Sequence, residues 1–367
     1  MATSWREWAT SKMPSSGAST WASSAAYDIV SGLTSGFQEA IRPSAQLTAS
    51  DIPAIDWAAH AASIQTRRDE KVAEYTNGEL AGAAKLGSEP GPDGWYKVAG
   101  GATANGGSGG CTVLSRDRQE KPTVGSNLAA TAAAAEGHAA ENATTTVQQT
   151  VVTFRVRGVT VEEFCCYFNS HHLWDSSVDG PARPIDSSPL ELGMNVRQPK
   201  ACAAAPALNS SATDLTWLLS FQVRYTYSHP FVRGTYPRDA CQITRFEMLP
   251  DGRAYFHSSS VDHSAAPQAE TTKKFVRALV KVDALVTPVV LGQGSDPRAG
   301  IAVDVHYEID LNPGGVVPLT LFRAISTRLF PSTFNALSTK CAAYFEGKPV
   351  LPPRELVGPW IVETLDA

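Results

Sequence analysis

The stretch that decides the fold reads IAVDVHYEIDLNPGGVVPLTLFRAISTRLFPSTFNALSTKCAAYF and covers residues 301–345. Its first ten residues alternate. One face carries Ile301, Val303, Val305, Tyr307 and Ile309, and the other carries Ala302, Asp304, His306, Glu308 and Asp310. Such alternation predicts a half-buried strand. The sequence NPGG at 312–315 then predicts a turn.

A long helix is expected after Pro318, because proline is favoured in the first helical turn. Apolar residues recur at spacings that place them on one helical stripe: Phe322, Ile325, Leu329, Phe334, Leu337, Cys341 and Phe345. Pro331 is expected to kink this helix. The charged residues between Asp310 and Glu346 are Arg323, Arg328 and Lys340, so the helix is cationic. A sheet that closes over such a helix either packs solid or leaves a cavity beneath it.

The composition excludes several classes of protein. A chain of 367 residues can bury one large core or two small ones, and its net charge of -5 lacks the basic surface of a nucleic-acid binder. The six cysteines form no CxxC pair, which favours reduced, buried thiols. Residues 1–8 lack a signal-peptide core, and no apolar run approaches the ~20 residues of a membrane span. We therefore expect a cytoplasmic protein.

Upstream, helices alternate with strands before a long run of strands. Apolar residues every four positions predict an amphipathic helix over 21–41, and a second helix is expected over 53–75. Thr160 and Glu163 form a capping box before a short helix. Strands are predicted at 95–98, 111–116, 151–156, 215–227, 240–248, 253–261, 274–282, 285–291 and 301–310, and 119–146 form a low-complexity insertion. This order indicates an α+β fold with an antiparallel sheet.

Four short motifs resemble the START (StAR-related lipid transfer) family, in the order in which that family carries them. They are Trp174-Asp175, Pro237-Arg238-Asp239, the segment from Ser258-Ser259-Ser260-Val261 to Val276-Arg277-Ala278, and Asp310 with Gly314-Gly315 and Pro318. The resemblance covers roughly residues 51–345. It leaves 1–50 as an N-terminal extension and 346–367 as a C-terminal tail.

The resemblance implies a helix-grip fold, in which a curved antiparallel sheet wraps around the long C-terminal helix with a lipid cavity between them. The candidate lipid-binding residues are Trp217, Tyr225, Tyr227, Arg245, Phe256, Phe322, Ile325, Leu329 and Leu337. Arg245 departs from the family pattern, because the cavity-lining arginine of sterol-type members falls at the position of Thr244. A shift of one residue turns a side chain to the other face of the sheet unless a bulge intervenes. Arg238 and Asp239 are expected to form a structural ion pair.

The sequence offers little for catalysis. Gly106-Gly107-Ser108-Gly109-Gly110 matches a nucleophile elbow, but it lacks the strand before and the helix after that the motif needs. His257, Ser259, Asp262 and His263 could suggest a triad, although a polar cluster at the solvent edge explains them better. The adjacent pairs Cys165-Cys166 and His171-His172 point apart, which disfavours a metal site. We expect no enzyme activity, no cofactor and no metal.

We therefore expect a protein that binds a single lipid, a phospholipid or a sterol, and transfers it between membranes or senses it. Transient peripheral contact with a membrane surface is expected, with the terminal helix as the gate of the cavity. The alternative is an enzyme on the same helix-grip scaffold, thioesterase-linked or cyclase-like.

Overall fold

The computed structural model describes residues 52, 54–77, 91, 94–99, 111–120, 145–175, 178, 182–187, 222–228, 237–266, 276–292, 298–312, 319–350 and 358–359. The predicted helix 21–41, residues 215–221 of a predicted strand and most of the 119–146 insertion lie outside these residues. Residues 119–120 and 145–146 belong to strands, so the insertion is shorter than predicted.

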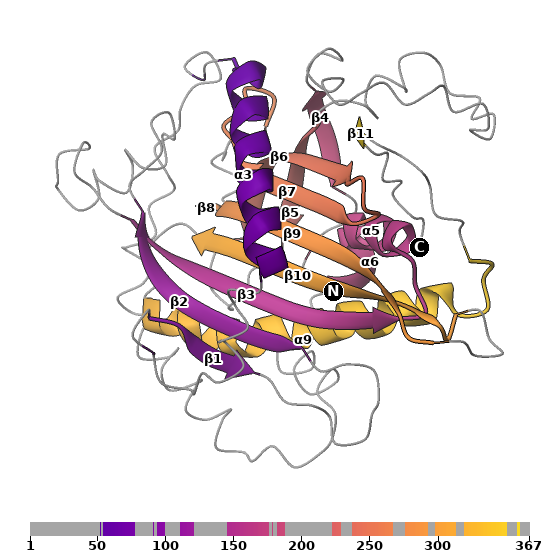
Figure 1. Ribbon diagram of the computed structural model, residues 1–367. Coiled ribbons are helices and arrows are strands. Elements are labelled where there is room, and N and C mark those ends of the chain that lie inside the picture. The colour runs from indigo at the N-terminus through magenta and orange to yellow at the C-terminus, as the bar shows by residue number, and fades with distance from the viewer. Residues whose placement is uncertain are drawn as a thin grey trace, which may run out of the picture.

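Helices flank a large sheet, and Figure 1 shows the helices and strands coloured in their order along the chain. The helices are α3 (Trp57–Asn77), α5 (Val161–Asn169), α6 (His171–Trp174) and α9 (Leu319–Phe345). The strands are β1 (Tyr96–Ala99), β2 (Thr112–Glu120), β3 (Thr145–Arg157), β4 (Arg183–Ser187), β5 (Gln222–Ser228), β6 (Arg238–Met248), β7 (Ala254–Ser260), β8 (Val276–Arg277), β9 (Leu279–Val290), β10 (Ile301–Asn312) and β11 (Gly358–Pro359). The predicted α+β class is confirmed.

Nine strands follow one another across the sheet in the order β1-β2-β3-β10-β9-β7-β6-β5-β4, and each neighbouring pair is antiparallel. β8 and β11 both pair with β6. The prediction of two strands over 274–282 and 285–291 was wrong, because β9 continues through Asp283. This aspartate is buried and paired inside the sheet, so it does not mark a turn.

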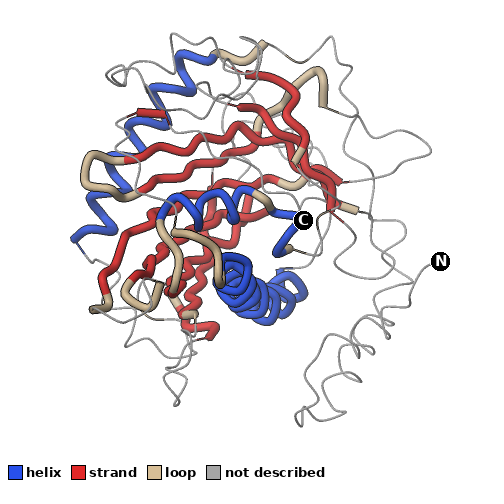
Figure 2. Tube along the Cα trace, turned by 90° about the vertical axis from the view of Figure 1, so that its right-hand side faces the viewer, coloured by secondary structure: helices blue, strands red, loops and turns tan. Residues whose placement is uncertain are grey.

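The two long helices lie on opposite faces of the curved sheet (Figures 1 and 2). We call the face against α9 the inner face; it carries Val152, Phe246, Phe256 and Val305. The face crossed by α3, which carries Glu247, His257, Asp283 and Glu308, is the outer face. The predicted terminal helix is confirmed, and α9 runs through Pro331.

The inner face and α9 share one apolar core. Side chains of β10 that were predicted to be apolar, Val303, Val305, Tyr307 and Ile309, all belong to it. The ring of Phe334 on α9 lies 4.7 Å from that of Tyr307 and 5.5 Å from that of Phe154, measured between centroids. The helix α5 closes one end of this core with Phe164 and Phe168.

The expectation that β10 is half-buried fits Asp304, whose side chain is 44% exposed, but it is wrong for Glu308 and Asp310 further along the same face. Glu308 is only 2% exposed and Asp310 only 4%, although both face away from α9. The helix α3 brings cations to them: Lys71 Nζ lies 2.7 Å from Glu308 Oε2. Alternation alone could not reveal this cover, because the covering helix lies more than 200 residues earlier in the chain.

The predicted capping box at α5 is present. The amide of Glu163 donates to Thr160 Oγ1 at 3.2 Å, and the amide of Thr160 donates to Glu163 Oε2 at 2.9 Å. Arg298 Nη2 also donates to Glu163 Oε1 at 2.9 Å, and to the carbonyl oxygen of Pro349. The buried Arg298 therefore ties the start of α5 to the segment after α9.

Among the helices that the structure describes, none is both long and apolar enough to span a membrane.

Candidate ligand-binding face

The inner face is packed solid beneath the C-terminal half of α9. Val303 on β10 and Leu337 and Cys341 on α9 have no exposed surface. The hydroxyl of Ser338 donates to the carbonyl oxygen of Arg155 at 3.2 Å, which fixes this half of the helix to β3. This end of the inner face therefore has the dense packing of a protein interior.

Burial decreases toward the N-terminal half of α9. Along the helix the exposed fraction rises from 0% at Leu337 through 3% at Phe334 to 8% at Phe330, and Leu329 is only partly buried. The strands beneath show the same trend, because β10 ends in the partly buried Leu311 and β9 begins near the partly buried Val280. These two residues are cross-strand partners. Apolar side chains at this end therefore keep some accessible surface, and we call it the incompletely packed end.

Polar groups lie on the inner face near β5 and α5. Arg224 of β5 donates from Nη1 to Asn169 Oδ1 at the end of α5. Burial lowers the pKa of Arg224 to about 10 and that of the nearby His171 to about 4. At neutral pH this corner therefore holds a buried guanidinium beside an uncharged imidazole.

A second polar group lies on the inner face of β1, β2 and β3. The hydroxyls of Ser115 and Thr150 are 2.9 Å apart, and both side chains are buried. Gln148 is 1% exposed, and its Nε2 donates to Tyr96 Oη at 3.3 Å. Its register partner on β10 is Leu311, so the amide lies beside the incompletely packed end.

The structure distributes the predicted lipid-binding residues over both faces. Phe256 and Leu337 belong to the inner core, and Leu329 lies on α9. Tyr225 was misplaced by the prediction, because it packs on the outer face in a cluster with Val223, Ile55 and Trp57. Trp217 and the side chains of Tyr227, Phe322 and Ile325 lie outside the described residues.

Arg245, one of the predicted lipid-binding residues, lies on the outer face, as the argument from a one-residue shift anticipated. Its neighbour Phe246 faces Phe256 in the inner core, with ring centroids 4.5 Å apart. β6 pairs with β7 in unbroken register through this region, so no bulge turns Arg245 inward. Its guanidinium instead lies 3.8 Å from Glu247, near α3.

Asp239 forms an ion pair with Arg277 instead of the expected pair with Arg238. Asp239 accepts two hydrogen bonds from Arg277, from Nε at 3.0 Å and from Nη2 at 2.8 Å. Consecutive residues of a strand point to opposite faces, so Arg238 and Asp239 are poorly placed to pair. Arg277 is the register partner of Asp239 on β8.

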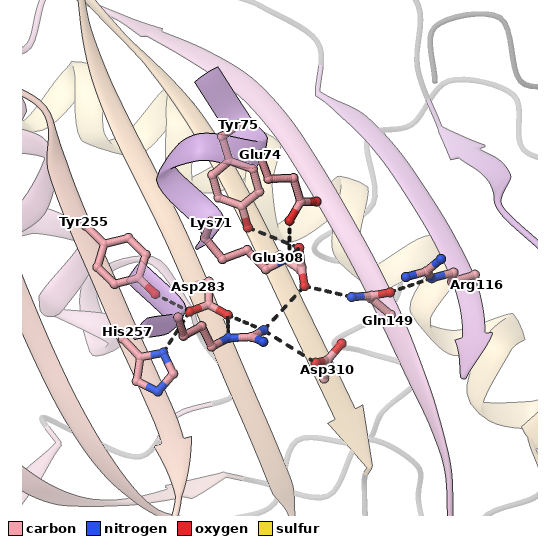
Figure 3. A network of polar contacts seen from close by, with 11 residues as sticks. Lys71, Glu74, Tyr75, Arg116, Gln149, Tyr255, His257, Asp283, Glu308 and Asp310 are labelled. Atoms are coloured by element: carbon pink, nitrogen blue, oxygen red, sulfur yellow. Dashed lines mark hydrogen bonds and ion pairs between the residues drawn. The ribbon is translucent and has the colours of Figure 1, made fainter. Parts of the chain in front are cut away.

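The polar cluster expected around His257 at the solvent edge is instead buried under α3 (Figure 3). Nδ1 of His257 and Oη of Tyr255 both contact Asp283 Oδ1, which also lies close to Arg67 of α3. His263 is elsewhere, with its Nε2 2.8 Å from Asp186. The two histidines of the expected cluster therefore contact different carboxylates.

Two polar residues of the inner face, Gln148 and Arg224, were not predicted from the sequence. Gln148 and Gln149 are adjacent in β3, so one of them has to face the apolar side, but nothing in TTVQQTVV tells which. Gln149 faces outward, where its Nε2 donates to Glu308 at 2.7 Å. Arg224 belongs to the polar set of the alternating strand β5, QVRYTYS, and this alternation predicts that it faces away from the core.

Comparison with known proteins gives structural matches alone. No protein-family model matches the sequence, and no curated protein matches it. The fold is similar to human STARD10 (16% identity, TM-score 0.43, 76% of this chain and 90% of that chain). It is also similar to human StAR-related lipid transfer protein 5 (15% identity, TM-score 0.43, 78% and 97%). A third similar structure is a STAR-related lipid transfer protein from Xanthomonas axonopodis (16% identity, TM-score 0.38, 68% and 99%).

Proposed function

We propose that this protein binds one lipid molecule between the inner face of the sheet and the N-terminal half of α9. The observation that carries the proposal is the decrease in burial from Leu337 to Leu329 on α9 and toward Leu311 on β10. Apolar surface that neighbouring side chains do not fill completely can be filled by an acyl chain or a ring system. Each buried CH₂ contributes ~0.8 kcal/mol, so such a ligand needs few polar contacts.

The motif resemblance to START domains supports the same function, and extends it to transfer of the lipid between membranes or sensing of it. A phospholipid and a sterol are both compatible with the apolar residues named above. We place the protein in the cytoplasm with transient contact to membrane surfaces.

The alternative, an enzyme on the same scaffold, has less support. A nucleophilic thiol needs a lowered pKa. Burial instead raises the thiol pKa of Cys165 and of Cys341, both on the inner side. Among the described residues, no group of three or more His, Cys, Asp or Glu side chains could hold a metal ion. We therefore propose binding without catalysis.

Native mass spectrometry of the full chain purified from cells tests the proposal. We expect a second mass peak, heavier by one lipid molecule, that disappears after extraction with organic solvent. Delipidated protein should regain the peak after incubation with vesicles of mixed phospholipid and sterol. A protein that purifies at its bare mass and takes up no lipid from these vesicles would overturn the proposal.

A further inference from the structure

Gln148 presents a buried polar group to the proposed lipid site. Its side chain is 1% exposed and lies on the inner face, in register with Leu311 of β10 and Asp117 of β2. Leu311 is one of the residues at which packing becomes incomplete. The amide therefore stands at the edge of the space that the proposed function assigns to the ligand.

The hydrogen bonding of this amide is incomplete. Nε2 donates to Tyr96 Oη, whereas Oε1 is buried and has no hydrogen-bond partner among the described residues. Leaving a buried amide group without a partner is costly, and native proteins rarely do so without a ligand or a water at the site. By contrast, the neighbouring hydroxyls of Ser115 and Thr150 share a hydrogen bond.

A hydroxyl group complements this amide in either orientation. If the amide is turned by 180°, Tyr96 donates to the oxygen and the NH₂ group becomes the free end. A hydroxyl can donate to a free oxygen and accept from a free NH₂ group, so it fits both arrangements. A quaternary ammonium group or an ester can serve at most one of them.

The charges around Gln148 argue against a phosphate. Asp117, the register partner of Gln148, carries a carboxylate that would repel an anion. None of the described side chains of β1–β3 on the inner face is basic. Lys97 and Arg116 lie on the outer face, since their register partners are Leu114 and Gln149. Among the described inner-face side chains of these three strands, the amide therefore has no cation beside it that could bind a phosphate.

From this arrangement we infer that Gln148 binds the hydroxyl group of a neutral lipid, which makes the ligand a sterol or a diacylglycerol-like molecule rather than a phospholipid. The inference rests on the proposed function, because it names the polar end of the same ligand. Gln148 then selects the ligand, while the apolar inner face supplies most of the affinity.

Matched probe pairs test this selection. The delipidated protein is titrated with dehydroergosterol and its 3-O-methyl ether, and with dioleoylglycerol and its O-methyl ether. Wild-type protein should prefer the hydroxyl compound of at least one pair by about tenfold, because the methyl ether cannot donate to a free amide oxygen and its added methyl group obstructs the approach to a free NH₂ group. Gln148→Met, of similar size but without the amide, should reduce this preference to about onefold. Thr153→Val is the control, since Thr153 lies on the outer face of the same strand and should leave the preference unchanged.

Equal affinity of wild-type protein for both members of each pair would overturn the inference, as would a preference that survives Gln148→Met. If Gln148 binds only an ordered water and no lipid hydroxyl, one of these two results is expected. Uptake of phospholipid but of neither hydroxyl probe would also overturn it, yet leave the proposed function standing. Uptake of no lipid at all would overturn both. If Gln148→Met does not fold, the side-chain NH₂ resonances of Gln148 in wild-type protein decide: they should shift with the hydroxyl probe and not with its ether.

Discussion

Nδ1 of His257 lies 2.8 Å from Oδ1 of Asp283, and both side chains are almost completely buried between α3 and the sheet. Burial alone would raise the pKa of Asp283, but hydrogen bonds from His257 and Tyr255 and the charge of Arg67 outweigh it and hold this pKa at about 2. Asp283 is thus ionised at neutral pH and joins α3 to the outer face (Figure 3).

Asp283→Asn should lower the free energy of unfolding by about 2–4 kcal/mol, because it leaves Arg67 and His257 partly unpaired in a buried site. The folded pKa lies below the unfolded value of about 3.9, so this stabilisation is present above about pH 4 and is lost as the pH falls toward 2. Urea unfolding from pH 7 to pH 2 should show a shallower loss for the variant in that window. Asp304→Asn, at an exposed pair with Arg155, should cost less than about 1 kcal/mol. Equal costs for the two variants would contradict the prediction.

The pair between Asp239 and Arg277 should contribute to stability and leave ligand choice unchanged. Asp239→Asn removes the carboxylate from a largely buried guanidinium and should cost about 3 kcal/mol. Arg277→Met in the same chain should recover part of that loss, because no buried charge is then left alone. Thermal unfolding and native mass spectrometry of bound lipid measure the two effects separately. A changed lipid preference at an unchanged melting temperature would contradict this assignment.

Tryptophan substitutions should distinguish the two ends of the inner face. Leu311→Trp adds volume where packing is incomplete, so it should block lipid uptake while changing the melting temperature little. Val303→Trp adds volume where the side chain has no exposed surface, and it should destabilise the fold by at least 1–3 kcal/mol. Calorimetry and lipid uptake by both variants test this. If Leu311→Trp destabilises as strongly as Val303→Trp, that end is solid core as well.

A cysteine at position 335 would test whether α9 is the gate of the site. Asn335 Oδ1 lies 3.4 Å from the amide nitrogen of Cys111, a free cysteine next to β2, so Asn335→Cys places a thiol close to it. The oxidised variant should keep its bound lipid but exchange it with vesicles far more slowly, and reduction should restore the rate. Wild-type protein under the same oxidant is the control. Exchange at the wild-type rate in the tethered variant would show that α9 need not move as a whole.

The cations of α9 should speed lipid exchange with anionic membranes. Replacing Arg323, Arg328 and Lys340 with Gln removes attraction worth up to ~1 kcal/mol each near a charged surface. Lys340 is exposed, with Nζ 3.4 Å from the carbonyl oxygen of Trp174, whereas the side chains of the two arginines lie outside the described residues. Exchange with phosphatidylserine vesicles should slow more than exchange with phosphatidylcholine vesicles. An equal effect on both would make these cations a solvated surface without a membrane role.

Periodicity predicted the elements well wherever one face of an element is apolar. The alternation of Val303, Val305 and Tyr307 identified β10, and the stripe from Phe334 to Phe345 identified α9, because both patterns arise from a single core. The capping box at Thr160 was equally readable, since it involves contacts only three residues apart. Local signals of this kind need no knowledge of the rest of the chain.

Long-range contacts were the part that the sequence could not supply. The charges of β10 were expected on the open face of a half-buried strand, because their partners Arg67 and Lys71 are distant in sequence. Tyr225 was expected beside α9 but lies on the outer face: alternation gives β5 an apolar face, but it cannot tell that this face packs against Ile55 and Trp57. The Gln148 oxygen, which has no hydrogen-bond partner among the described residues, became visible only when the neighbours from three strands were in place.

The position of β10 between β3 and β9 has a consequence for the way the chain assembles. The strands β1, β2 and β3 meet the strands β9, β7, β6, β5 and β4 only through β10, which is the last of these strands to leave the ribosome. Before Ile301 has been synthesised, two partial sheets therefore present unpaired edges, which are prone to wrong pairing. Closure of the sheet requires contacts across roughly 150 residues, from Val156 to Val303, which makes folding slow. A chain cut short before this strand would have to be handled by chaperones or degraded rather than fold partially.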